Sequence, residues 1–164
     1  MVYREAVKVF SHSGVPTFHN VTEAANAVVR NSGIRNGIVN VYSHHTTCCV
    51  ITQEAAFDMS MTGMETLQAD FVEVFEKIIP ACRKEGMYLH PGPKALKFAE
   101  EHGEDARGCH NTDAHLRSAL VGRSETIALI DGAMDLGDFG YIYFVDFDQT
   151  RGRERTVQIT VIGE

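Results

Sequence analysis

The chain has 164 residues, a length typical of one domain with a single sizeable core, so we expect one domain over residues 1–164. Its 44% hydrophobic and 23% charged residues are typical of a soluble globular protein, and its formal net charge of -7 argues against nucleic acid or an anionic membrane as a partner. No apolar run is long enough to span a bilayer and no basic-then-apolar signal opens the chain, so the cytoplasm is the expected location.

The first 52 residues predict a strand, a helix and two further strands. Residues 2–10 are mostly β-forming and predict the first strand. Thr22 is a suitable N-cap for a helix whose alanines and valines share one face, and Gly33 would end that helix. The β-rich runs at 37–42 and 46–52 predict the next two strands.

The longest predicted helix begins near Glu65 and ends close to Pro80. Leu67 and four further apolar residues follow the helical period, and the four should pack on the sheet: Phe71, Val74, Phe75 and Ile78. A shorter helix is expected over 93–101, since proline suits a first turn and the following residues favour helix. Asp113 is expected to cap one or two turns that carry His115 and Ser118.

The remainder of the chain predicts strands over 126–130, 139–147 and 155–162, with turns between them. Strands outnumber helices and do not alternate with them regularly. This order predicts an α+β fold, a single compact domain with a mixed, mostly antiparallel sheet packed against helices. The glycines at 132 and 137 lack the spacing of a dinucleotide-binding loop and are interpreted as turns.

The segment His44-His45-Thr46-Thr47 places imidazoles beside hydroxyl groups in an expected strand. On a strand, His45 and Thr47 would face one side and His44 and Thr46 the other. A neutral imidazole beside a hydroxyl suits metal ligation, proton transfer or phosphate binding. The alternative is that both histidines are ordinary residues of an edge strand.

Two carboxylates are candidates for supporting roles. Glu54 follows the expected strand directly, and we interpret it as a general base or as the acceptor that orients a metal ligand. Asp70 lies early in the long helix, where the helix dipole alone would favour a carboxylate. Asp70 is therefore the alternative acceptor, although its position at the start of the helix is explained equally well by the helix dipole.

No metal-binding motif with short spacing occurs, so a metal site would be assembled from separate segments. The best trio is His45, His90 and His115. Three imidazoles with one open coordination position suit zinc or another divalent ion.

These segments together resemble the YjbQ family, also called UPF0047 or "secondary thiamine-phosphate synthase" proteins. The resemblance covers almost the whole chain, and its most specific parts are His45-Thr46-Thr47 and Asn111 with Ala114-His115-Leu116. It implies a compact α+β homotrimer. It also implies formation of thiamine phosphate from a pyrimidine diphosphate and a thiazole phosphate, with release of pyrophosphate.

Three features depart from the family pattern. Phe139-Gly140 stands where the family usually has Trp-Gln, and the chain has no Trp. The segments before Asp70 and before Asn111 are longer than usual, and the second includes Pro91-Gly92-Pro93. We expect these insertions to reshape the mouth of the pocket.

The leading hypothesis is an enzyme of the thiamine-phosphate synthase type with a histidine-rich pocket for phosphorylated metabolites. Its expected catalytic residues are His45, Glu54 and His115, and a zinc or magnesium ion would bind His45, His90 and His115. The expected substrate-binding residues are Thr46, Thr47, Asn111, Ser118, Arg117 and Arg123. Two alternatives are a metal-dependent hydrolase with Glu54 as general base, and a non-catalytic metal- or metabolite-binding trimer.

Overall fold

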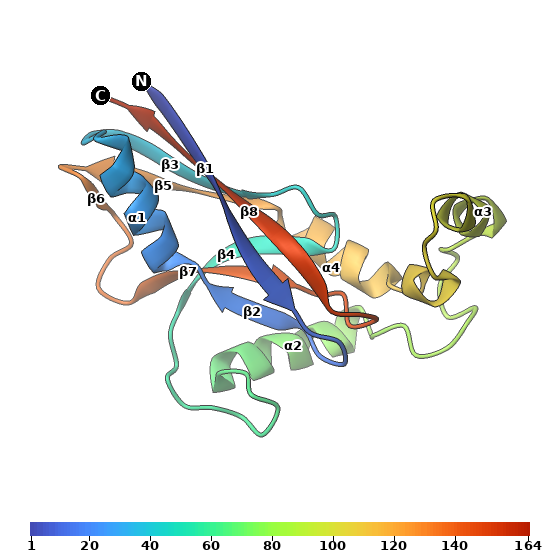
Figure 1. The fold of residues 1–164 in the computed structure, drawn as a ribbon. Coiled ribbons are helices and arrows are strands. Elements are labelled where there is room, and N and C mark those ends of the chain that lie inside the picture. The colour runs from blue at the N-terminus through green and yellow to red at the C-terminus, as the bar shows by residue number, and fades with distance from the viewer.

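Two antiparallel β-sheets and four α-helices form the computed structural model, which describes all residues from 1 to 164 (Figure 1). The strands are β1 Val2–Ser11, β2 Thr17–Asn20, β3 Gly37–Ser43, β4 Cys48–Glu54, β5 Ser124–Ile130, β6 Ala133–Met134, β7 Gly140–Asp146 and β8 Arg153–Gly163. The helices are α1 Thr22–Ser32, α2 Thr66–Ile78, α3 Pro93–Glu101 and α4 Thr112–Val121, with a short 3₁₀ helix, η1, at Ala106–Cys109.

The larger sheet has five strands in the order β1-β8-β3-β5-β6, and the smaller has three in the order β2-β7-β4. Every strand pairing is antiparallel. The predicted α+β domain is confirmed, and its strands divide between two facing sheets instead of forming one. The short strands β2 and β6 were not expected, because four and two residues carry no readable alternation.

The main hydrophobic core lies between the two sheets, where α1 fills one end (Figure 1). Val28 and Val29 of α1 pack there with Val39 of β3, Phe144 of β7 and Ile159 of β8. The predicted helix stop is confirmed, since Gly33 has a φ of 67° at the C-cap. Thr22 is not the N-cap: Val21 takes that position, and the Thr22 hydroxyl accepts the Ile142 N–H at 2.8 Å.

A second core lies on the outer face of the smaller sheet, which α2 and α4 cover. Phe75 of α2 is buried, and its ring lies 4.9 Å from Phe71 and 5.6 Å from Phe147 between centroids. The prediction that Val74 and Ile78 join this face is wrong, because they are 55% and 60% exposed. The helix contacts only a narrow three-stranded sheet, so a narrow stripe of α2 is enough to cover it.

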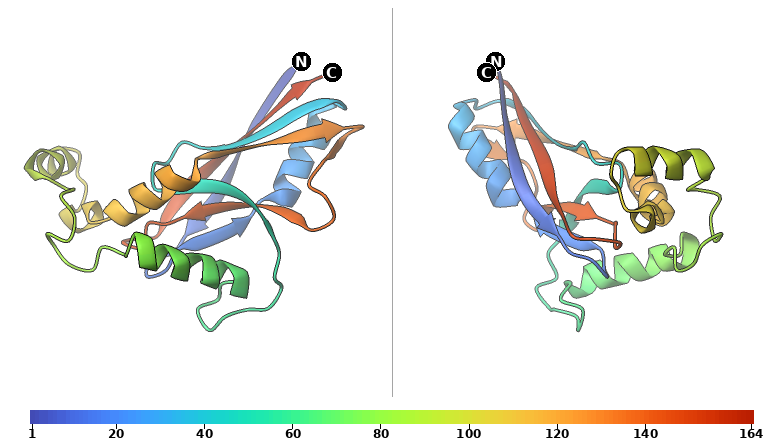
Figure 2. Two further views of the ribbon diagram at one scale, coloured as in Figure 1. Left: turned by 180° about the vertical axis from the view of Figure 1, so that it is seen from behind. Right: turned by 45° about the vertical axis from the view of Figure 1, so that its right-hand side comes forward.

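Helix α4 is longer than the one or two turns that were predicted. Asn111 occupies its N-cap position, whereas Asp113 lies inside the first turn and is buried, so the expected Asp113 cap is wrong. Helix α3 has the predicted bounds. It projects away from both sheets, beyond η1 and the start of α4, in all three views (Figures 1 and 2). No helix has both the length and the apolar character needed to cross a membrane.

Candidate functional site

A cavity of about 720 Å³ lies between the sheets' edge and the projecting segment that carries α3. Its volume falls within the usual range for small-molecule sites. Four segments line it: the β3–β4 connection, the chain from His90 through α3 to η1, the start of α4, and the chain from Asp148 to Arg155. Segments far apart in the sequence therefore meet at one place.

The His-Thr-Thr segment contributes one wall, but it does so from a turn. Strand β3 ends at Ser43 and β4 begins at Cys48, so His44–Thr47 form the connection between them. The expected alternation of these side chains on a strand is therefore wrong. All four residues nevertheless line the cavity.

His45 is held by the backbone of β8. Its Nε2 accepts the Thr156 N–H at 3.0 Å, so in the neutral ring the proton resides on Nδ1. Partial burial, followed by the positive charge of Arg155, lowers the pKa of His45 below its ordinary value of about 6.5. The side chain is therefore a neutral imidazole near pH 7 and offers a donor at Nδ1.

His90 and His115 stand together on another part of the wall. Their ring centroids are 5.8 Å apart and the rings are nearly perpendicular, at 88°. Burial, and next the neighbouring His90, lower the pKa of His115. The structure thus brings His45, His90 and His115 to one cavity, as the sequence reasoning expected.

The described chain gathers no three His, Cys, Asp or Glu side chains in an arrangement that would hold a metal ion. The three histidines line the same cavity without forming a common ligand set. Within one chain the three imidazoles do not form the expected ligand set, and the zinc or magnesium ion itself stays a prediction.

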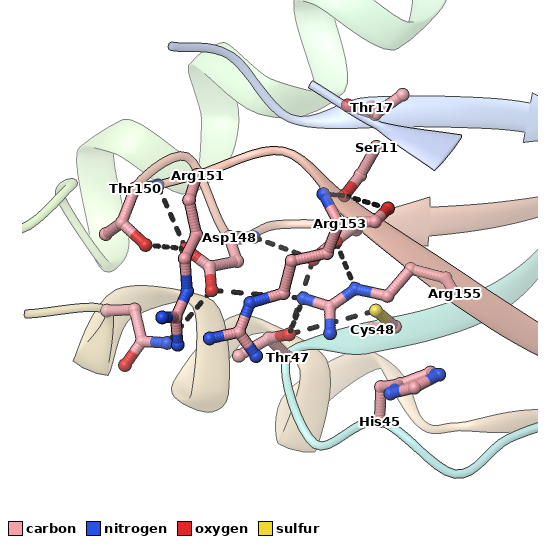
Figure 3. Close-up of polar contacts among 12 residues, drawn as sticks. Ser11, Thr17, His45, Thr47, Cys48, Asp148, Thr150, Arg151, Arg153 and Arg155 are labelled. Carbon is pink, nitrogen blue, oxygen red and sulfur yellow. Dashed lines mark hydrogen bonds and ion pairs between the residues drawn. The ribbon is translucent and has the colours of Figure 1, made fainter. Parts of the chain in front are cut away.

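Three arginines form a further part of the wall, next to the His-Thr-Thr segment. Arg151, Arg153 and Arg155 lie in a row beside Asp148 and Thr47, as Figure 3 shows. They follow one another at two-residue spacing as the chain enters β8, and residues so spaced share one face of a strand. In a chain with a net charge of -7, this wall is a local concentration of positive charge.

Arg155 is the innermost of the three and is tied into a buried network. Its Nε donates to Asp146 at 2.6 Å, and its Nη2 donates to the Thr47 hydroxyl at 3.2 Å. Arg155 and Asp146 are 4% and 0% exposed. Asn111 is fixed alongside, since its Nδ2 donates to Asp148 at 3.1 Å. These bonds orient the cavity floor, so the expected ligand-binding groups of Thr47 and Asn111 already have protein partners.

Arg151 and Arg153 make fewer side-chain hydrogen bonds within the protein than Arg155 does. Both donate to the same Glu104 oxygen, Arg153 at 3.2 Å. The Nε of Arg151 is buried and has no hydrogen-bond partner. A Cβ added at Gly108 would lie 2.8 Å from the Arg151 guanidinium carbon, so this glycine allows the guanidinium to pack against the backbone of η1.

Neither candidate carboxylate lies at the cavity. Glu54 ends β4, while the His-Thr-Thr turn precedes the start of the same strand, so about 20 Å of extended chain separates them. Glu54 instead borders a separate shallow pocket with Phe139 and Gly140. Asp70 is exposed on α2. The catalytic role expected for Glu54 and the orienting role considered for Asp70 therefore find no support in the geometry of one chain.

Three predicted substrate-binding residues are structural. Arg117 is fully buried, pairs with Glu76 at 2.8 Å and donates to the Ile79 carbonyl. The Ser118 hydroxyl donates to the Cys48 carbonyl at 2.5 Å. Arg123 lies over the Tyr42 ring, 5.7 Å from its centroid. None of the three borders the large cavity, because α4 turns Arg117 and Ser118 toward the smaller sheet.

Sequence reasoning missed the arginine row and the wall formed by α3. Arg151, Arg153 and Arg155 were included only in an expected turn and strand. Their alternation was the available signal, since it places three cations on one side of the chain. No sequence pattern indicated that Glu104 would pair with Arg151 and Arg153, because this contact depends on how the long segment between His90 and Asn111 folds back.

The fold and the site together define an α+β protein of two antiparallel sheets, with an arginine- and histidine-lined cavity at the edge of the sheets. Residues 7–164 match the family described as "UPF0047 protein YjbQ-like". The chain belongs to this YjbQ/UPF0047 family. The family resemblance predicted from the sequence is thereby confirmed.

Relatives from archaea and bacteria support the assignment. A UPF0047 protein of Methanothermobacter thermautotrophicus is 30% identical over 145 residues, which are 88% of this chain and 82% of that protein. The UPF0047 protein YugU of Bacillus subtilis is 26% identical over 144 residues, which are 88% of each chain.

Solved structures share the fold. A YjbQ/UPF0047 protein from Clostridium acetobutylicum is similar with a TM-score of 0.69 at 22% identity, over 95% of this chain and 99% of that one. A hypothetical protein from Aeropyrum pernix K1 has a TM-score of 0.69 at 26% identity, over 98% of this chain and 99% of that one.

Proposed function

We propose that the chain is an enzyme that binds a small phosphorylated metabolite in the large cavity and uses a neutral histidine for proton transfer. One observation carries the proposal: Arg151, Arg153 and Arg155 line the same cavity of about 720 Å³ as His45, His90 and His115. Guanidinium groups bind phosphate oxygens with charge-assisted hydrogen bonds. Imidazoles with a lowered pKa can exchange protons near neutral pH.

The three arginines differ in the partners that they already have within the protein. Arg155 is committed to Asp146 and fixes the floor, whereas Arg151 and Arg153 share a single carboxylate, that of Glu104. The unpartnered Nε of Arg151 is a donor that a phosphate oxygen would satisfy. Charge that develops on a departing phosphate or pyrophosphate would be stabilised by these preorganised donors.

The two kinds of histidine suit different roles. His45 has its Nε2 occupied by the Thr156 N–H and offers only a donor at Nδ1, so it would position the substrate. In contrast to His45, the ring of His115 accepts no backbone N–H, and burial lowers the pKa of this side chain. We therefore assign proton acceptance to His115, with His90 beside it.

The thiamine-phosphate type of transfer implied by the family resemblance is one reaction within this proposal. It needs a leaving pyrophosphate and no protein nucleophile, and the arginine wall meets that need. The zinc or magnesium ion expected from the sequence stays a prediction. The homotrimer and the cytoplasmic location belong to the same proposal and stay predictions too.

The test measures binding of inorganic phosphate by calorimetry and turnover of a panel of phosphorylated metabolites, with and without Mg²⁺ and Zn²⁺. The panel includes a pyrimidine diphosphate with a thiazole phosphate. Arg153→Met should weaken phosphate binding about tenfold to a hundredfold, the worth of one hydrogen bond between charged groups. The control is Arg35→Met, since Arg35 is 67% exposed and pairs only with Asp131 at 3.6 Å. Equal binding by both variants would contradict the proposal.

A further inference from the structure

The segment that carries α3, residues 91–110, has few contacts with the rest of the protein, and Figure 2 shows α3 well beyond both sheets. Only Ala99 and Gly108 are buried in this segment, and none of its residues belongs to either hydrophobic core. Its hydrogen bonds and ion pairs stay within the segment, with the single exception of those made by Glu104. A segment with so little buried apolar surface opens at a low cost in free energy.

Glu104 attaches this segment to the cavity wall. One carboxylate oxygen, Oε2, accepts hydrogen bonds from the Nη2 atoms of Arg151 and Arg153, the second at 3.2 Å. The Glu104 N–H donates to the Ala99 carbonyl at 2.9 Å, so the carboxylate is fixed relative to the end of α3. The segment is therefore held by the same two guanidinium groups to which the proposed function assigns the phosphoryl group of the ligand.

Glu104 also balances the charge of the arginines. Three carboxylates, those of Glu104, Asp146 and Asp148, lie against the three guanidinium groups. Asp146 and Asp148 are 0% and 1% exposed and accept further hydrogen bonds from the protein. The side chain of Glu104 is 43% exposed and pairs only with Arg151 and Arg153. Glu104 is thus the carboxylate that can leave, and its departure gives the arginines a net positive charge.

We propose that a phosphoryl group entering the cavity replaces the Glu104 carboxylate on Arg151 and Arg153, and that this exchange releases the segment 91–110 from the cavity wall. The inference rests on the proposed function and adds how ligand access to that site is regulated. A phosphoryl group on the two guanidinium groups would lie beside the carboxylate, and like charges at such short range repel each other. The phosphoryl group carries the larger negative charge and gains more from the same donors. Because coupling between two binding events is reciprocal, a change that frees the arginines from Glu104 must strengthen phosphate binding.

Glu104→Gln tests the exchange, since it keeps the shape of the side chain and removes its charge. Calorimetry at pH 8 should show inorganic phosphate binding about tenfold more tightly to Glu104→Gln than to the wild type, because binding no longer breaks a hydrogen bond between charged groups. The matched control is Glu101→Gln in the same segment, where Glu101 pairs only with Lys97, at 3.8 Å. Both variants lose one negative charge, but Glu101→Gln should bind phosphate as the wild type does.

Hydrogen–deuterium exchange followed by mass spectrometry measures release of the segment. In the wild type, saturating phosphate should speed exchange of the backbone amides of residues 91–110. In Glu104→Gln these amides should exchange faster already without phosphate, and phosphate should add little. In Glu101→Gln they should respond to phosphate as in the wild type. Because the Glu104 side chain is largely exposed, circular dichroism of each variant should match that of the wild type.

The outcomes separate this inference from the proposed function. If inorganic phosphate binds to neither the wild type nor Glu104→Gln, the proposed function fails. If phosphate binds to the wild type and binds no more tightly to Glu104→Gln, Glu104 does not compete with the ligand. If phosphate slows exchange in residues 91–110 or leaves it unchanged, the segment is not released. Either of these last two results overturns this inference alone.

Discussion

Replacing Asp146 by Asn should destabilise the chain strongly, because it leaves Arg155 charged and buried without its closest counterion. The Arg155 Nε donates to the Asp146 Oδ2 at 2.6 Å, and both residues are at most 4% exposed. Asparagine keeps a carbonyl oxygen at Oδ1 for its existing partners, the Thr47 hydroxyl at 3.3 Å and the Asp148 N–H at 3.0 Å. The substitution therefore keeps the bonds at Oδ1, removes the buried ion pair and turns the asparagine Nδ2 donor toward the Arg155 Nε–H.

Removing one partner of a buried ion pair costs about 3–5 kcal/mol. Asp148 lies 3.9 Å from Arg155 and retains part of the attraction, so we expect a loss of about 3 kcal/mol in the free energy of unfolding. In a domain of this size that loss lowers the Tm by roughly 6–12 °C. Urea and thermal unfolding followed by circular dichroism, at one fixed protein concentration, measure both quantities.

The matched control is Asp131→Asn, which breaks the Arg35–Asp131 pair, whose side chains are 67% and 80% exposed. An exposed pair of this kind contributes less than about 1 kcal/mol. A loss of less than about 1 kcal/mol for Asp146→Asn as well would refute the reasoning, since Arg155 would then be adequately solvated without its partner.

Other expectations concern activity and stability separately. His115→Ala should abolish turnover while the protein stays folded; an early-melting variant that works normally would make His115 structural. Glu54→Gln should leave turnover unchanged, because Glu54 lies away from the cavity; a loss of activity in a stable variant would restore its catalytic role. Arg117→Met should lower stability by about 1–3 kcal/mol, since the Ile79 carbonyl and Glu76 lose their donor while Glu76 keeps Arg83, and phosphate binding by the folded protein should stay intact. The pKa of His115 is lowered on folding, so the unfolded chain binds more protons below pH about 6.5 and this group's contribution to stability is lost as pH falls through that region. Tm measured from pH 7.5 to 5.5 should therefore fall less steeply in His115→Gln than in the wild type, and parallel curves would contradict this.

Helices with a clear period were predictable, and their details were not. The bounds of α3 followed from its proline start and helix-forming residues, and Gly33 ended α1 as expected. The orientation of α2 was not predictable, because Val74 and Ile78 satisfy the same helical period as the buried Phe75. Which of several apolar residues is buried depends on the width of the sheet below, a tertiary property.

In the candidate site, too, some residues were placed correctly from the sequence and others were not. Three histidines from distant segments were correctly expected in one cavity, because unusual residue types in apolar surroundings indicate a common use. Arg117 and Ser118 were misassigned because a polar side chain on a buried helix face and one on a ligand-binding face look alike in sequence. Their partners, Glu76 and the Cys48 carbonyl, lie 41 and 70 residues away.

The order of strands in the larger sheet has a consequence for synthesis of the chain. Strand β8 is the last along the described chain, yet it lies between β1 and β3, with Val2 opposite Ile162 at one end of the β1 pairing. While the ribosome is still making residues before 153, β1 has no neighbour and β3 has one bare edge. Unpaired edges of this kind are prone to pair with other chains, so the nascent protein is most exposed to misassociation before β8 is made. The same late strand brings Arg153 and Arg155, so the sheet and the cavity are completed in one event.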